Sequence, residues 1–155
     1  MTEVAQYNEL NNEIDRQLDA AREKIQSVFK AVFADFFAKC PEAHALGWTQ
    51  GTPSWNDGDA TEFSVHEVNL YLTEEALDGN DSHQDILKYR SNGNSEAIAA
   101  VGGEVRLREI LAHFAAVRTF VQKVDDEDMR LIFGDGARIT ATAQELEIED
   151  YEDDY

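Results

Sequence analysis

Residues 5–39 read AQYNELNNEIDRQLDAAREKIQSVFKAVFADFFAK, and they form the longest periodic run in the chain. Apolar side chains recur in this run at steps of three or four residues, which predicts one amphipathic helix. Those side chains are Leu10, Ile14, Leu18, Ala21, Ile25, Val28, Val32 and Phe36. Cys40-Pro41 ends the predicted helix, because the residue before a proline is pushed out of the helical region.

At about 1.5 Å per residue this helix is about 50 Å long, which exceeds the width of a small domain. The helix therefore either breaks near Asn11-Asn12 or projects from the domain over residues 1–20 and packs against another chain. The spacing from Ile14 to Val32 suits a coiled-coil seam, so a homodimer through the N-terminal helix is one expectation. The other is a helix that covers only its own sheet.

The second half of the run is rich in phenylalanine, at Phe29, Phe33, Phe36 and Phe37. Such rings favour the packing of a helix on a sheet, because they bury a large area on a pleated surface. A ligand pocket is the alternative use of these rings.

Two alternating runs, residues 43–50 and 60–72, predict strands joined by a long turn over residues 51–59. In the second run the alternation slips between Val65 and Val68, which indicates a β-bulge near His66-Glu67. Residues 73–103 are polar and rich in Gly, Asn, Asp and Ser. A loop of that length in a compact domain is usually functional or mobile, or contains a short helix.

A second helix is predicted over residues 104–124. Its apolar face consists of Leu107, Ile110, Leu111, Phe114, Val117, Phe120, Val121 and Val124. The acidic residues Asp125, Asp126 and Glu127 follow it, and acids at a helix C-terminus oppose the macrodipole. We therefore expect that end of the helix to fray or to turn.

The last segment predicts short strands. Residues 129–133 and 137–142 form a predicted hairpin around Gly134-Asp135-Gly136, and residues 146–149 form a further strand. Residues 150–155 are an acidic tail that we expect to be disordered. The whole order predicts an α+β fold in one domain, residues 1–149, with an antiparallel sheet of about five strands and two main helices packed on one face.

The composition narrows the class of protein further. Thirty-two Asp and Glu oppose 13 Lys and Arg among 155 residues, a formal net charge of −19, so direct binding to nucleic acid is disfavoured. The chain contains no apolar run long enough for a membrane span and does not begin with a secretory signal. The single cysteine, Cys40, fits a reducing compartment, and a cytoplasmic location is expected.

The acidic residues are concentrated at the C-terminal end. Residues 125–155 hold twelve acids and two arginines, a net charge of −10, whereas the other 124 residues carry −9. A small domain needs only about −2 to −8 for solubility, so a basic protein partner is expected. A purely solvating surface and metal buffering are the alternatives. The candidate partner-binding residues here are Glu145, Glu147, Glu149, Asp150, Glu152, Asp153 and Asp154.

A second candidate site is the turn at residues 48–59, WTQGTPSWNDGD. Exposed tryptophans favour recognition of a partner, and the candidate residues are Trp48, Gln50, Trp55, Asn56, Asp57 and Asp59. The alternative is that Trp48 fills the core and Asn56-Asp57-Gly58 only shapes the turn. A nucleotide or another small ligand held here, with residues 73–103 as a lid, is a further hypothesis.

The sequence contains no motif of a catalytic site. The four histidines are scattered at positions 44, 66, 83 and 113 without zinc-ligand spacing, and no nucleophile motif is present. We therefore expect no enzyme activity, no cofactor and no bound metal.

The pattern Trp48-Thr49-Gln50-x-Thr52-Pro53-x-x-Asn56-Asp57-Gly58-Asp59, followed by Phe63-Ser64-Val65, resembles a family of small uncharacterised bacteriophage proteins. The likeness extends to residues 36–42 and to the Phe133-Gly134-Asp135-Gly136 turn, and it covers residues 25–72 and 128–151. Where an aromatic residue is expected after the glutamine, this chain has Gly51.

This resemblance implies an α+β fold and a phage protein in the host cytoplasm, but no chemistry. Together with the charge it leads us to expect a phage-encoded, non-catalytic acidic protein that engages and inhibits or modulates a basic host protein, for instance by nucleic-acid mimicry. The alternatives are a self-assembling structural protein and the small-ligand module.

Overall fold

The computed structural model describes residues 2–54, 58, 60–88 and 92–152. The elements in chain order are α1 (Glu3–Lys39), β1 (Ala45–Gly51), β2 (Ser64–Val65), β3 (Asn69–Tyr71), α2 (Glu74–Asp78), α3 (Asn92–Ala100), α4 (Glu104–Gln122), α5 (Asp126–Phe133), β4 (Ala137–Ala141) and β5 (Leu146–Asp150). None of the helices so described is long and apolar enough to cross a membrane.

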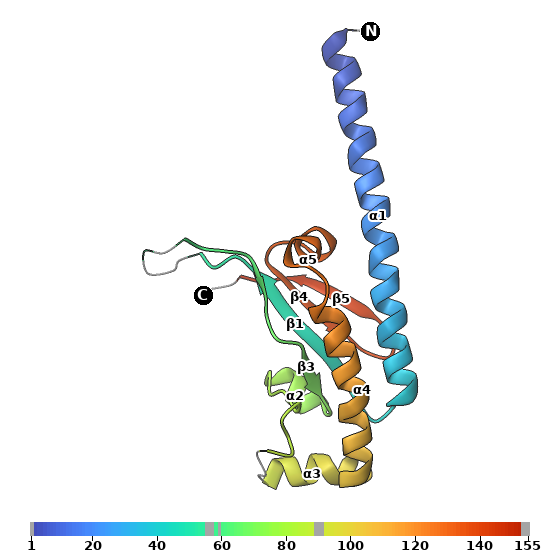
Figure 1. The fold of residues 1–155 in the computed structure, drawn as a ribbon, viewed down its shortest axis with the longest axis vertical. Helices are drawn as coiled ribbons and strands as arrows, with labels where there is room; N and C mark the ends of the chain where they lie inside the picture. Colours follow the sequence, from blue (N-terminus) through green and yellow to red (C-terminus); the bar gives the residue numbers. More distant parts are fainter. Residues whose placement is uncertain (1, 55–57, 59, 89–91, 153–155) are drawn as a thin grey trace.

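The strands form one antiparallel sheet in the order β2-β1-β4-β5. Strand β3 also pairs with β1, at Ala45–Gly47, whereas β2 pairs at Gln50 and Gly51. Helices α1, α4 and α5 lie on one face of this sheet (Figure 1). The α+β class and an antiparallel sheet of five strands are therefore confirmed, although residues 60–72 supply two of the strands and three helices, not two, cover the face.

Helix α1 is continuous from Glu3 to Lys39, and its first half projects beyond the rest of the molecule (Figure 1). The Thr2 hydroxyl begins the helix by accepting a hydrogen bond from the amide of Ala5 at 3.2 Å. The helix does not break at Asn11-Asn12, because two residues of moderate propensity do not offset a long run of good helix formers.

The second half of α1 packs into the core through the four phenylalanines identified from the sequence. Phe29 meets Phe133 edge to face with ring centroids 5.0 Å apart, and Phe33 lies 6.0 Å from Trp48. Trp48 is itself 5.4 Å from Phe133. These rings join α1, α5 and the central strand β1, and edge-to-face pairs add stability beyond the area that they bury.

The expected bulge is present between β2 and β3. Gln50 pairs with Val65 and Gly47 with Asn69, so three steps along β1 correspond to four steps along its partner. The amide of His66 donates to the carbonyl of Thr49 at 2.9 Å, at the bulge. This one extra residue explains why the alternation of apolar and polar residues shifts by one position in the sequence.

Residues 73–103, treated above as a loop, contain the helices α2 and α3. The Thr73 hydroxyl caps α2 by accepting from the amide of Ala76 at 3.1 Å. Ala76 then packs with Ala45 and Tyr71, which face each other across β1 and β3. Helix α2 thereby contacts the end of the sheet.

The predicted strand over residues 129–133 is wrong, because this segment is the helix α5. Asp126, Glu127 and Asp128 occupy its first turn, where negative charge favours the helix dipole. Met129, Ile132 and Phe133 are buried at helical spacing, a pattern too short to distinguish from a strand in the sequence. The acids therefore begin α5 instead of disturbing α4, which ends at Gln122.

The expected disorder from residue 150 onwards is also wrong at its start. Asp150 belongs to β5 and pairs with Ala137. The amide of the half-buried Tyr151 donates to the carbonyl of Gly136 at 2.9 Å, which continues the pairing. Backbone pairing thus fixes the beginning of the acidic segment, although its side chains are polar.

Candidate functional site

The C-terminal carboxylates named from the sequence lie on an ordered edge strand. Glu145, Glu147, Glu149, Asp150 and Glu152 are all exposed on or beside β5, and we call them the β5 carboxylates. Asp153 and Asp154, also named above, lie outside the described residues. Within the described part of the chain no lysine or arginine forms an ion pair with the β5 carboxylates.

The register of β5 determines which way its acids point. Ile148 pairs with the buried Ile139, so Glu147 and Glu149 share the opposite face of the sheet, away from the helices. The Cα atoms of Glu147 and Glu149 are about 7 Å apart along the strand. The pKa of Glu147 is raised because its protonated carboxyl donates a hydrogen bond to the Glu149 carboxylate and because the Glu149 charge repels its ionised form. The strand thus holds negative charges close enough to oppose one another.

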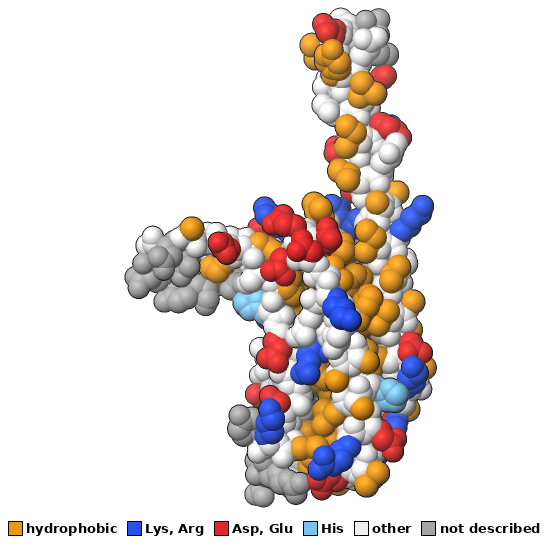
Figure 2. Space-filling model, in the orientation of Figure 1, with side chains coloured by type: hydrophobic (Ala, Val, Ile, Leu, Met, Phe, Trp, Pro, Cys, Tyr) orange, Lys and Arg blue, Asp and Glu red, His pale blue; other side chains and the backbone are white. Residues whose placement is uncertain are grey.

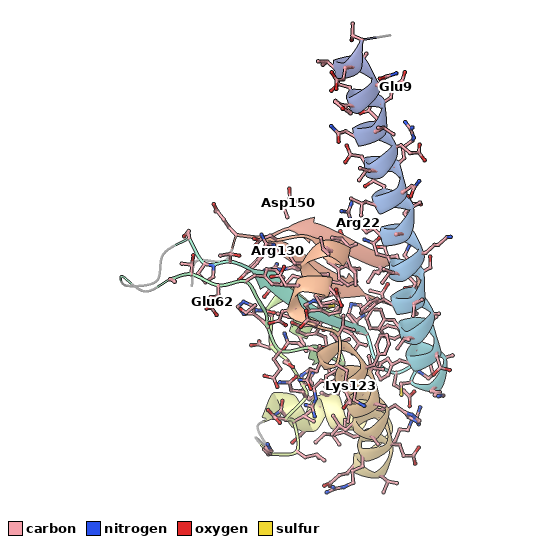
Figure 3. All side chains as sticks on the ribbon, turned by 45° about the horizontal axis from the view of Figure 1, so that its top comes forward. Glu9, Arg22, Glu62, Lys123, Arg130 and Asp150 are labelled. Atoms are coloured by element: carbon pink, nitrogen blue, oxygen red, sulfur yellow. The ribbon has the colours of Figure 1, made fainter. Side chains whose placement is uncertain are left out.

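A second group of acids lies at the start of α5 and consists of Asp125, Asp126, Glu127 and Asp128, which we call the α5 carboxylates. All four side chains are exposed. Arg130 lies 3.6 Å from Glu127 and 3.8 Å from Asp135, and its guanidinium also lies over the ring of Phe63. Figure 2 shows the acidic side chains gathered around α5, and Figure 3 places Arg130 and Asp150 on the side of the body from which α1 projects.

The two arginines of residues 125–152 are therefore occupied by their own surroundings. Arg130 forms ion pairs with Glu127 and Asp135. The Arg138 guanidinium carbon lies 5.2 Å from the centre of the Tyr151 ring. No ion pair joins a cation of this segment to the β5 carboxylates, although Arg138 lies opposite Glu149 in the register of β4 and β5.

Two residues assigned to the turn site, Trp48 and Gln50, lie in the core. Trp48 is 2 % exposed and Gln50 is fully buried, so their assignment to a partner-binding surface is wrong. The Gln50 oxygen accepts from Trp48 Nε1 at 3.1 Å, and its nitrogen donates to the carbonyls of Met129 at 2.9 Å and Gly134 at 2.7 Å. The amide is buried because these three groups satisfy it completely, and it links β1 to α5.

The described part of the turn is held by Asp135, a residue that the sequence did not single out for this role. The carboxylate of Asp135 accepts from the amide and from the hydroxyl of Thr52, each at 2.9 Å. The other candidates in the turn, Trp55, Asn56, Asp57 and Asp59, lie outside the described residues.

The titratable side chains of His83 and Cys40 have structural roles. The imidazole Nδ1 of His83 accepts from the amide of Leu72 at 3.1 Å, and burial lowers the pKa of His83. Cys40 is buried, and burial raises the pKa of its thiol, which leaves it a poor nucleophile. Among the described residues no group of three or more His, Cys, Asp and Glu side chains could hold a metal ion.

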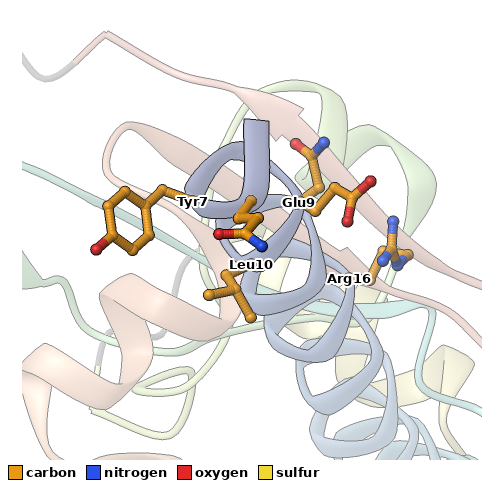
Figure 4. Close-up of a pocket in the computed structure, with 6 residues that line it drawn as sticks. Tyr7, Glu9, Leu10 and Arg16 are labelled. Atoms are coloured by element: carbon orange, nitrogen blue, oxygen red, sulfur yellow. The ribbon is translucent and has the colours of Figure 1, made fainter. Parts of the chain in front are cut away.

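Surface hollows offer little to the small-ligand hypothesis. One hollow lies between α2 and α3, but Glu75, Asp81 and Glu96 line it, and they would repel a phosphate. Another is formed only by side chains of successive turns of α1, near Tyr7, Glu9, Leu10 and Arg16 (Figure 4). Neither hollow is lined by a described residue of the turn at 48–59.

The structure exposes one surface that the sequence indicated only in part. Apolar side chains project into solvent from the first half of α1, and two of them, Val4 and Tyr7, precede the pattern that begins at Leu10. We call the exposed set the α1 apolar face: Val4, Tyr7, Leu10, Ile14 and Leu18. Leu131 is also 65 % exposed, because α5 is a helix and not the predicted strand and it turns this side chain away from the core.

Comparisons of the chain with protein-family models, with curated proteins and with solved structures gave no match.

Proposed function

We propose that this chain is a non-catalytic binding protein that engages a basic protein through the β5 carboxylates. The observation that carries the proposal is that these five exposed carboxylates have no ion-pair partner in the described part of the chain. Such unneutralised charge costs stability through self-repulsion, and a basic partner relieves that cost.

The spacing of the charges favours a basic protein over close imitation of duplex DNA. Residues 145–152 span about 24 Å if extended, so the five carboxylates supply one charge per about 5 Å. A single DNA strand supplies one per about 3.4 Å, and the duplex one per about 1.7 Å. The β5 carboxylates alone are therefore sparser than a nucleic acid, and mimicry needs the α5 carboxylates as well.

The resemblance at residues 48–59 extends the proposal to a phage setting. In that setting the partner is a host protein whose basic surface normally holds nucleic acid, and occupation of the surface inhibits or modulates the partner. Electrostatic steering would speed the encounter, and salt would slow it.

The test is affinity capture from a bacterial lysate with the full chain as bait, at about 0.05 M and about 0.5 M salt. The variant E145Q/E147Q/E149Q/D150N removes four charges and keeps the side-chain shapes. The matched control E62Q/E67Q/E74Q/D78N removes four exposed acids elsewhere.

We expect basic proteins to bind the wild type and the control at low salt, and to be lost with the β5 variant or at high salt. Addition of duplex DNA competes if the captured surface is a nucleic-acid site. Capture that is unchanged both by the β5 variant and by salt would refute the proposal.

A further inference from the structure

We infer that the α1 apolar face binds the same face of a second copy of this chain, with the two helices antiparallel. The exposed fractions are 69 % for Val4, 56 % for Tyr7, 59 % for Leu10, 55 % for Ile14 and 57 % for Leu18. Figure 2 shows these apolar side chains along the projecting helix, continuing towards the body. In Figure 4 Tyr7 and Leu10 point to one side of the helix, and Glu9 and Arg16 point to the other.

The apolar face has the two seam positions of a coiled coil. One position recurs every seven residues at Val4, Asn11, Leu18 and Ile25, and the other at Tyr7, Ile14, Ala21 and Val28. A seam of this kind is formed with another helix, and the structure provides none along the projecting half (Figure 1). Asn11 is a polar residue in the middle of the exposed part, and a polar residue at a seam position carries a cost in stability.

The exposed area is sufficient for a dimer of two such helices. Each of the five side chains leaves on the order of 100 Å² uncovered, so two copies bury about 1,000 Å² from these residues alone. Flanking side chains add to this sum. The total reaches the range of specific interfaces, which begins at about 1,000 Å².

The body of the molecule begins to contact α1 where the projecting half ends. The Arg22 guanidinium donates to the carbonyl of Leu131 at 2.9 Å, and the Gln26 amide donates to that of Ile132 at 2.7 Å. From there on, the body covers the phenylalanine side of the helix, where Phe29 is 2 % exposed, whereas Ile25 and Val28 of the seam are still 41 % and 54 % exposed. In a parallel pair the two bodies would lie side by side at the same end of the seam. In an antiparallel pair the projecting halves overlap and the two bodies lie at opposite ends.

Charges along the seam favour the antiparallel pair. When Val4 lies opposite Ala21 of the second copy, Glu3 lies opposite Lys24 of that copy at both ends of the seam. Each end then gains a pair of opposite charges. The two Asn11 residues come close to the two-fold axis in this register, in adjacent layers of the seam.

Leu131 extends the interface onto the body. A groove between α1, α4 and α5 is lined by Ile25, Val28, Phe120, Val124 and Leu131. In the antiparallel register the N-terminal end of the second helix reaches the level of Ala21 and Arg22, next to Leu131. The second copy therefore covers an apolar side chain of α5 as well as the α1 apolar face.

Oligomeric state is the first test, measured by light scattering on the full chain over a range of concentrations. The variant I14E/L18E places two charges on the seam, whereas N12E/A20E places two on the opposite side of the same helix turns. We expect the wild type and N12E/A20E to have twice the mass of one chain, and I14E/L18E to have the mass of one chain. Circular dichroism checks that all three are folded. A wild type that stays monomeric at about 0.5 mM would overturn the inference.

Orientation is tested by oxidation of variants with one introduced cysteine, since the native Cys40 is fully buried. An antiparallel pair separates the two Val4 residues by about 25 Å and brings Val4 next to Ala21 of the other copy. We expect a disulfide when V4C is mixed with A21C, and none with V4C alone. A V4C homodimer linked by a disulfide would overturn the antiparallel arrangement. The β5 carboxylates take no part in this interface, so both tests are independent of the proposed function.

Discussion

Replacement of Gln50 by alanine is the sharpest test of how α5 is held on the sheet. The variant Q50A removes three hydrogen bonds, one from Trp48 Nε1 and two to the carbonyls of Met129 and Gly134. At about 1 kcal/mol each they contribute about 3 kcal/mol. The indole N–H, left buried and unpaired, costs about 1–2 kcal/mol more. We therefore expect a loss of about 4–5 kcal/mol, a large part of the stability of a typical domain, about 5–15 kcal/mol.

The assay is urea unfolding followed by tryptophan fluorescence, because Trp48 is buried among aromatic rings and reports on the core. The control Q144A truncates an exposed amide and should change the free energy of unfolding by less than about 0.5 kcal/mol. If Q50A loses less than about 1 kcal/mol with an unchanged denaturant slope, the buried amide does not hold α5 on β1 and the reasoning fails.

Three further predictions concern other contacts. The Arg106 guanidinium, hydrogen-bonded to Glu42, holds the pKa of that carboxyl below its ordinary value. E42Q should therefore be less stable than wild type near neutral pH, and the difference should shrink as acid protonates Glu42 in the folded state, measured by urea unfolding at several pH values. E149Q should lower the raised pKa of Glu147, which NMR titration measures. A raised carboxyl pKa makes the folded state less stable as the pH rises through that pKa, so the stability of E149Q should decrease less over this pH range than that of the wild type. G136A should lower the stability measured by thermal unfolding by about 1–3 kcal/mol, and by more than G134A does. Both glycines have positive φ, but only at Gly136 would a Cβ lie 2.8 Å from the carbonyl oxygen of Tyr151. Equal losses in the two variants would refute the steric part of this reasoning.

The spacing of apolar residues predicted the structure correctly for helices and strands that bury one face in the core. The helical period predicted α1 and α4 and their buried residues, because apolar burial depends on spacing that can be read directly. The shift in alternation after Val65 predicted the bulge for the same reason. The exposure of Glu147 and Glu149 followed from the high cost of burying an unpaired charge.

Local pattern failed where short elements or distant partners were involved. Residues 126–133 carry an apolar spacing that suits either a strand or a helix, and packing of Phe133 against Phe29 and Trp48 accompanies the helical outcome. Asp150 was taken for part of a tail because its side chain is polar, yet its backbone pairs with Ala137. Polarity of a side chain says little about where its backbone hydrogen bonds are made.

The amino-acid order alone fixed the class of fold, the long helix with its apolar face, and the acidic C-terminal segment, because each depends on neighbours along the chain. The tertiary structure decided that Gln50 is a core residue, since its partners lie 79 and 84 residues away. It also decided that the body buries the phenylalanines in the second half of α1 and leaves the α1 apolar face exposed, because the sheet and α5 extend no further along the helix. Contacts between distant segments decide whether a polar side chain finds hydrogen-bond partners in the core and whether an apolar side chain is buried. Neither outcome can be read from the residue's neighbours along the chain.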